Sequence, residues 1–143
     1  MFGSLDRLQS FGALVLRLTL GAIMLAHGYS KIIPHGALYG FTHMVQQLGM
    51  PPWLGYVAAF TEFFGGLLLI LGLLTRVAGL AVAIEMAVAI IKVHLRHGLT
   101  GPGGFEFPLA VFAIALMLVT TGSGLLALDD LVGRGGGRIK TAR

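Results

Sequence analysis

Four long apolar segments make up most of this chain and constrain its fold more than any other feature. They cover residues 11–33, 54–74, 77–97 and 105–128. A helix needs about 20 apolar residues to cross the hydrocarbon core of a bilayer. Backbone polar groups inside a bilayer must bond to one another, which helices achieve within a single segment. The sequence therefore predicts an all-α integral membrane protein, a bundle of four transmembrane helices.

The composition supports a single membrane domain over residues 1–143. The chain is 56% hydrophobic and 11% charged, whereas average soluble proteins carry about 25% charged residues. Four spans leave no room for a second, water-soluble domain. The Gly- and Arg-rich segment 131–143 is predicted to be a flexible basic tail.

The segment between the first two spans is too short and too polar to cross a membrane. Pro34 should end the first helix, because proline cannot continue the hydrogen-bond ladder. Residues 35–53 then carry apolar side chains at helical spacing, with Trp53 at the far end. Aromatic residues of this kind favour the headgroup boundary. We expect a short interfacial helix here. The brief Thr75-Arg76 connection predicts that spans two and three form an antiparallel hairpin.

The distribution of basic residues predicts the orientation and the partners. Six basic residues fall on one side of the predicted membrane and three on the other: Arg7, Arg76, Arg134, Arg138, Lys140 and Arg143 against Lys31, Lys92 and Arg96. Cytoplasmic loops carry the excess of Lys and Arg, so both termini should be cytoplasmic. The lipid bilayer is the expected partner. No basic stripe with interleaved aromatic residues is present, so no nucleic-acid partner is expected.

Ionisable residues inside the apolar segments indicate a polar interior. A charge in hydrocarbon costs about 3 kcal/mol, so such residues usually face the bundle interior and mark a site. From the rise of about 1.5 Å per residue, His27 and Glu62 lie about 9 and 12 Å below the outer ends of their spans and could meet. Arg17 and Glu85 lie about 24 and 18 Å down, which predicts a buried Arg17–Glu85 pair, with Arg17–Glu62 as an alternative of longer reach.

We predict that these residues and their neighbours line one ligand-binding pocket. Its candidate members are Arg17, His27, Lys31, Glu62, Glu85, Lys92, His94 and Glu106. His94 lies on the face of an ideal helix opposite Glu85, so it joins the pocket only if the helix end unwinds or its other face also packs inward. Structural alternatives stay open: Arg17 could simply fix helix register with Glu85, and His27 and Lys31 could anchor the helix at the headgroups. Gly65 and Gly66 should allow close helix approach.

Several kinds of chemistry are excluded or disfavoured. The chain has no cysteine, which rules out disulfides, thiolate nucleophiles and cysteine-held clusters in its own side chains. We predict no metal site and no covalent cofactor, since no HExxH spacing occurs. A divalent ion at His94, His97 and Glu106, or a haem between His27 and His94, is the weaker alternative.

Four sequence stretches together resemble the DoxX family of small four-helix membrane proteins, which is related to DoxD. They are RLTLGAIMLAHGYSKI, EFFGGLLLILGLLTR, IEMAVAIIKVHLRHG and GGFEFPLA, which carry Arg17, His27, Lys31, Glu62, Glu85, His94 and Glu106. The resemblance implies a four-helix integral membrane protein. It also implies a redox-linked role, because the family is named for a subunit associated with a quinone-linked oxidoreductase.

Two functional hypotheses follow. In the first, the protein is a redox-linked subunit of the bacterial inner (plasma) membrane that binds a quinone or similar small polar molecule in the pocket. A redox partner protein would supply electrons, because the chain has no cysteine to hold a redox centre. In the second, it is a non-enzymatic carrier of a small molecule or lipid, or an assembly factor for membrane proteins. Four helices are few for a carrier, so a homo-oligomer is expected.

Overall fold

The computed structural model describes residues 3–135, and it is helical throughout apart from the connections. The α-helices are α1 (Gly3–Ile32), α2 (Ala37–Gln47), α3 (Trp53–Leu71), α4 (Thr75–Ala89), α5 (Glu106–Thr121) and α6 (Leu128–Gly135). A π-helical turn, Ile90–His94, and a 3₁₀ turn, Leu95–His97, continue α4. The prediction of an all-α fold is confirmed.

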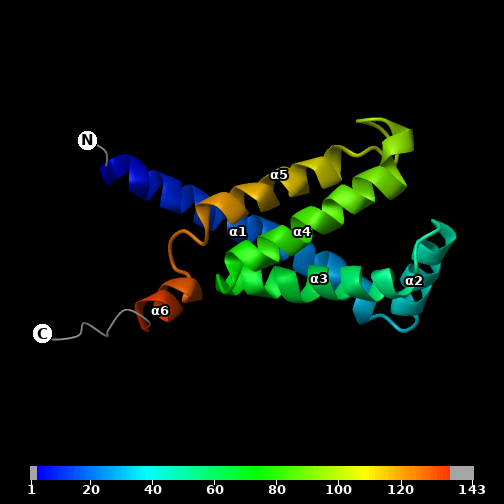
Figure 1. The fold of residues 1–143 in the computed structure, drawn as a ribbon, viewed down its shortest axis with the longest axis horizontal. Coiled ribbons are helices and arrows are strands. Elements are labelled where there is room, and N and C mark those ends of the chain that lie inside the picture. Colours follow the sequence, from blue (N-terminus) through cyan, green and yellow to red (C-terminus); the bar gives the residue numbers. More distant parts are fainter. Residues whose placement is uncertain (1–2, 136–143) are drawn as a thin grey trace, which may run out of the picture.

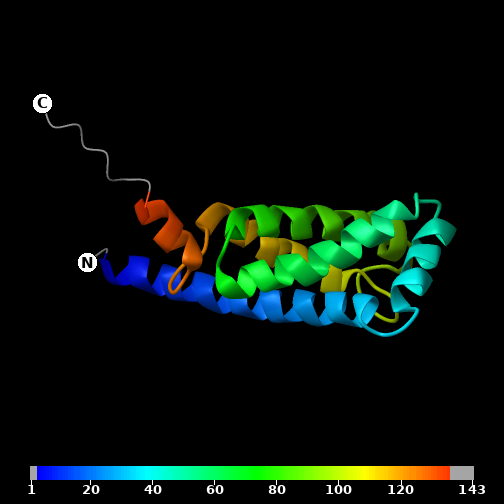
Figure 2. The ribbon, with the colours of Figure 1, turned by 90° about the horizontal axis from the view of Figure 1, so that it is seen from below.

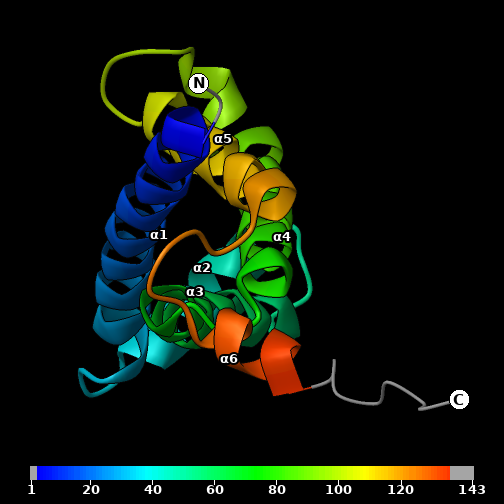
Figure 3. The same cartoon turned by 90° about the vertical axis from the view of Figure 1, so that its left-hand side faces the viewer.

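Four helices form the bundle, and α2 lies across one of its ends (Figure 1). α1 packs most extensively on α3 and α4 on α5, while α3–α4 and α1–α5 contacts close the ring. Seen end-on, α1, α3, α4 and α5 surround a common interior (Figure 3). The core between them includes Leu20, Leu69, Val82 and Leu118, none of which is exposed. The first turn of α1 and α6 lie at the same end of the bundle (Figure 2).

Three of these helical stretches are long and apolar enough to cross a membrane: Arg7–Ile32, Trp53–Leu71 and Thr75–His97. The fourth, α5, is apolar but has only 16 residues. At 1.5 Å per residue it is about 24 Å long, shorter than a hydrocarbon core of about 30 Å. Together they make a membrane helical bundle. α2 is the predicted short helix between the first two spans.

The ends of several predicted elements differ from the structure. The fourth apolar segment was expected to be helical to residue 128, but α5 ends at Thr121 because Gly122 adopts φ +83° and Gly124 adopts φ +69°. Left-handed backbone of this kind breaks a helix and is open mainly to glycine. The tail was expected to be flexible from residue 131, yet α6 extends to Gly135. The rest of that tail, residues 136–143, lies outside the described residues.

Glycines explain why α1 and α3 pack so closely. A Cβ atom on Gly66 would overlap the backbone nitrogen of Leu25, and one on Gly28 would overlap the backbone of Phe63. A Cβ on Gly21 would lie 2.9 Å from the carbonyl oxygen of Gly66. Small residues let helix backbones approach in this way inside membranes. The predicted role of Gly66 is confirmed. Gly65 faces α4 instead, where a Cβ atom would lie 3.7 Å from the Val82 side chain, an ordinary contact distance.

Candidate functional site

A buried ion pair joins the end of α1 to the middle of α3. Lys31 Nζ lies 2.5 Å from Glu62 Oε1 and 2.6 Å from Glu62 Oε2. The side chain of Glu62 is 5% exposed and that of Lys31 is 22% exposed. The Lys31 ammonium also lies 4.3 Å from the centre of the Phe41 ring, a cation–π distance. Lys31 therefore reaches inward from a helix end and neutralises a carboxylate that has little access to water.

The local sequence brings these two side chains together. Buried positions on α3 recur every three or four residues and are mostly small: Gly55, Ala59, Glu62, Gly65, Gly66 and Leu69. Gly28 on α1 packs directly on the backbone of Phe63. Lys31 follows Gly28 by one helical turn, on the same face. The close contact at Gly28 thus brings the ammonium to the carboxylate of Glu62.

Glu85 on α4 completes the group. Its carboxyl interacts electrostatically with both Glu62 and Lys31, and it can share a hydrogen bond with Glu62 when one of the two carboxyl groups is protonated. With both ionised, the Oε2 atom of Glu85 is buried without a hydrogen-bond partner in the described part of the chain. We call Lys31, Glu62 and Glu85 the charge cluster. It contains two carboxyl groups and one ammonium group. Such a set can hold a proton between the carboxyl groups and can offer both a donor and an acceptor to a polar molecule.

Five of the eight predicted site residues lie outside the charge cluster: His27, Lys92, His94, Glu106 and Arg17. His27 is exposed and its ring stacks on Phe107, with 5.5 Å between ring centres. Lys92 and Glu106 are exposed. His94 follows the change from α-helix to π-helix, and its Nδ1 atom lies 2.7 Å from the carbonyl oxygen of Gly103. The helix end does change its winding, but His94 then contacts the loop before α5.

The predicted Arg17–Glu85 pair is wrong. Arg17 is 1% exposed and donates from Nη2 to the carbonyl oxygen of Leu126, at 3.0 Å. The acidic residues that act on it electrostatically are Asp129 and Asp130. The physical reason is the early end of α5: the chain that follows it folds back against α1 and presents its own acceptors to Arg17. Arg17 and Glu85 consequently belong to different regions of the bundle.

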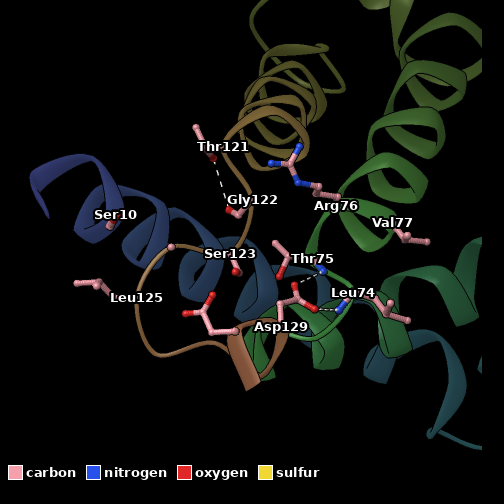
Figure 4. Close-up of a pocket in the computed structure, with 12 residues that line it drawn as sticks. Ser10, Leu74, Thr75, Arg76, Val77, Thr121, Gly122, Ser123, Leu125 and Asp129 are labelled. Carbon is pink, nitrogen blue, oxygen red and sulfur yellow. Dashed lines mark hydrogen bonds between the residues drawn. The ribbon is translucent and has the colours of Figure 1, made fainter. Parts of the chain in front are cut away.

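A second polar region lies at the end of the bundle where α6 is found (Figure 4). Asp129 accepts hydrogen bonds from the backbone N–H groups of Leu74, at 2.7 Å, and Thr75, at 3.0 Å. It thereby caps the start of α4 from another element of the fold. Burial alone would raise the pKa of Asp129, but the bonds from Thr75 and Leu74 outweigh burial and hold the pKa below its ordinary value.

Sequence reasoning missed this second region. Its signals were present: an Asp-Asp pair after the last apolar segment and Gly72 just before Thr75. Gly72 has φ +66°, and its α-carbon lies against the Arg17 guanidinium, where a Cβ atom would overlap Nη1. Because the partners are far apart in sequence, spacing alone could not assign them. Within residues 3–135, no three His, Asp or Glu side chains are grouped as metal ligands.

Comparison with known proteins now identifies the family. The family model described as DoxX matches residues 12–95, which include Arg17 and all of the charge cluster. The chain belongs to the DoxX family. It is therefore an integral membrane protein of that family, as its apolar helices indicate. α5 and α6, which complete the second polar region, lie beyond the match to the DoxX model.

Relatives of this DoxX-family chain come from several bacteria. It is 37% identical to the "Putative oxidoreductase CatD" of Bacillus subtilis, over 87% of this chain and 89% of that protein. An uncharacterized protein of Haemophilus influenzae is 30% identical over 89% of this chain and 95% of its own length. The "Inner membrane protein YqjF" of Escherichia coli is 25% identical over 91% and 98%. No solved structure matches the chain.

Proposed function

We propose that this protein is a redox-linked membrane subunit that binds a quinone or a similar small molecule at the charge cluster. The observation that carries the proposal is the Glu85 carboxyl group. It lies beside an ion pair in the bundle interior, and while both glutamates are ionised its Oε2 atom has no hydrogen-bond partner among residues 3–135. An unsatisfied buried polar atom costs about 1–3 kcal/mol. A carbonyl or hydroxyl group of a ligand that bonded this oxygen would recover that free energy.

The residues of the cluster fit a quinone headgroup. A protonated carboxyl group donates one hydrogen bond, whereas a carboxylate only accepts. Glu85 can therefore bond a carbonyl when protonated and a hydroxyl when ionised. A quinone, when bound, supplies two-electron chemistry and takes up one proton for each electron. Glu85 can carry such a proton and Lys31 can compensate the remaining charge, while the electrons come from the redox centre of a partner protein.

The family and location of the chain support this proposal. The Bacillus subtilis relative, which carries the word oxidoreductase in its name, is 37% identical to this chain over 124 residues. The Escherichia coli relative is named as an inner membrane protein. We extend the redox-linked role and the bacterial inner membrane location to this chain. We also propose that both of its termini are cytoplasmic. The excess of Lys and Arg in the two terminal segments and at Arg76, on that side, supports the orientation.

Quenching of tryptophan fluorescence tests the proposal directly. Trp53 is the single tryptophan of the chain and begins α3, about 14 Å along the helix axis from Glu62. Purified protein in detergent is titrated with a ubiquinone or menaquinone analogue. We expect saturable quenching, weakened about tenfold in Glu85→Gln, the factor that 1.4 kcal/mol of lost interaction gives. The matched control is Glu106→Gln, an exposed glutamate outside the cluster, which should bind like wild type.

A non-enzymatic role is the second candidate: a carrier of a small molecule or lipid, or an assembly factor. The specific observation in its favour is that both oxygens of Glu62 already bond Lys31. That ion pair can stabilise the packing of α1 against α3 without any ligand. If folded protein gives no saturable quenching, or if Glu85→Gln binds as wild type does, quinone binding at the cluster is refuted and this second role is favoured.

A further inference from the structure

The second polar region contains a cavity that the proposed function does not use. Its volume is about 630 Å³. Ser10 of α1, Arg76 of α4 and Ser123 after α5 line it from three sides, with Asp129 at the start of α6 (Figure 4). The charge cluster contributes no residue to it. An open cavity of this size, with polar side chains in its wall, can admit a small charged group.

Arg76 gives the cavity a positive group, and only one of its nitrogen atoms is engaged in the hydrogen bond that follows. Its Nη1 atom donates to the carbonyl oxygen of Val119, at 2.9 Å. The guanidinium lies over Gly122, where a Cβ atom would be 3.4 Å from Nη2 and 3.5 Å from Nε. Within the described residues, Arg76 forms no ion pair with a carboxylate. A guanidinium that keeps neighbouring N–H donors is suited to bind a phosphate group through two parallel bonds.

Asp130 gives the cavity a negative group. Its neighbour Asp129 also lines the cavity, but the oxygens of Asp129 already cap α4 by accepting from Leu74 and Thr75. Asp130 is exposed and takes no part in that cap. Arg17 acts electrostatically on both aspartates, but it is 1% exposed and does not line the cavity. Within the cavity, the exposed carboxylate of Asp130 would repel a phosphate that carried no positive group. The cavity therefore matches a ligand that carries both a phosphate and a positive group.

The position of the cavity favours a lipid over a soluble ligand. It opens beside the turn between α3 and α4, two helices that each cross the membrane, so it lies at the level of the headgroups. Three apolar side chains also line it and remain exposed, Leu74 (53%), Val77 (63%) and Leu125 (42%). A soluble headgroup would leave these surfaces uncovered, whereas the upper part of an acyl chain would cover them.

We propose that this cavity binds the headgroup of an aminophospholipid, a phosphatidylethanolamine. Arg76 bonds the phosphate, and Asp130 accepts a hydrogen bond from the primary ammonium group. A choline headgroup has no N–H to donate to Asp130, and a glycerol headgroup has no positive charge. The cavity should therefore select phosphatidylethanolamine over both. This inference does not depend on quinone binding at the charge cluster.

Native mass spectrometry of the full chain released from micelles tests this inference. Phosphatidylethanolamine, phosphatidylcholine and phosphatidylglycerol with identical acyl chains are titrated separately. We expect phosphatidylethanolamine to bind about tenfold more tightly than either other lipid, which corresponds to about 1.4 kcal/mol. Asp130→Asn, which keeps an acceptor oxygen but removes the charge, should weaken the preference over phosphatidylcholine. Arg76→Gln should weaken all three lipids alike. Arg7→Gln, an exposed arginine outside the cavity, should leave the preference intact.

The outcomes separate the possibilities. Equal binding of the three lipids, or a preference that Asp130→Asn leaves unchanged, would overturn the proposal. Because Arg76 also bonds the end of α5, its variant is compared with Arg76→Lys, which keeps the charge and should retain part of the affinity. Glycerophosphoethanolamine is the soluble competitor. If it displaced the lipid at equal concentration, the ligand would be a free headgroup compound and the lipid assignment would be wrong.

Discussion

At the scale of single residues, Glu62 shows how the bundle tolerates a buried charge. A carboxylate that is 5% exposed would be costly alone, and Lys31 compensates it with two short contacts. Replacing a whole buried ion pair by apolar groups is often harmless, whereas removing one partner is not. The pair thus links α1 to α3. The protein should lose stability when one partner is replaced, but not when both are replaced together.

We predict that Glu62→Gln destabilises the protein by about 3 kcal/mol, because Lys31 then keeps a charge without its partner. The double variant Lys31→Met with Glu62→Gln should recover most of that loss. Unfolding by SDS in mixed micelles measures both. Equal destabilisation in the single and double variants would show that the ion pair does not carry this energy.

Asp129 gives a pH dependence with a defined sign. Its pKa is held below the ordinary value of 3.8 by the bonds from Thr75 and Leu74. A lowered pKa means that the folded state is stabilised while the carboxylate is ionised, above the unfolded pKa. This stabilisation should be lost as the pH falls below about 3.8 toward the lower folded pKa.

The corresponding variant is Asp129→Ala, which should cost about 1 kcal/mol near neutral pH through the lost helix cap. The difference in unfolding temperature between wild type and variant should shrink as the pH falls below that value. Asp130→Asn, in the same turn but outside the cap, is the control. A difference that stayed constant with pH would contradict the assigned cap.

The sequence identified the charged residues but not all of their partners. Glu62, Glu85 and Lys31 could be selected because charges are rare in apolar segments and mark polar interiors. Arg17 was assigned to Glu85 from depth alone. Its actual acceptor is the backbone carbonyl of Leu126, which depth and helical periodicity cannot predict, because the position of that carbonyl depends on how a loop folds back.

At the scale of helices, packing between α1 and α3 depends on glycines whose missing side chains admit the neighbouring backbone. We predict that Gly66→Ala destabilises the bundle by about 3 kcal/mol, the upper range for overpacking, since the new methyl group would meet backbone atoms of Leu25. Gly12→Ala is the matched control on α1, because nothing lies within 4 Å of that position.

Thermal unfolding in detergent measures both glycine variants. The control should be neutral or slightly stabilising, because alanine favours a helix over glycine. If Gly66→Ala were as stable as Gly12→Ala, the close approach of the two helices would not be required for the fold.

Helix positions followed from the sequence better than helix ends. Hydropathy located the apolar helices and proline marked the end of the first. The end of α5 was missed by seven positions, residue 128 against Thr121, because the apolar residues Leu125–Leu128 continue the hydropathy signal after the helix has stopped. Gly122 and Gly124 were the signal in the sequence that the helix ends near residue 121. Both adopt left-handed backbone in the structure, which a helix cannot continue through.

At the scale of the whole molecule, the account requires α6 and the first turns of α1 on one side of the membrane and α2 on the other. The chain has no native cysteine, so single cysteines can report the side. We predict that Gln9→Cys and Asp130→Cys are protected from a membrane-impermeant maleimide in intact cells, while His43→Cys and Thr100→Cys are labelled. Labelling of all four, or the reverse pattern, would contradict the orientation.

The most direct test of the central claim is infrared difference spectroscopy of the protein with a bound quinone during electrochemical reduction. The account predicts a change in the carboxyl region as Glu85 exchanges a proton with the ligand. This signal should disappear in Glu85→Gln and persist in Glu106→Gln. A spectrum without any carboxyl change, or one that Glu85→Gln leaves intact, would contradict a redox-linked role for the charge cluster.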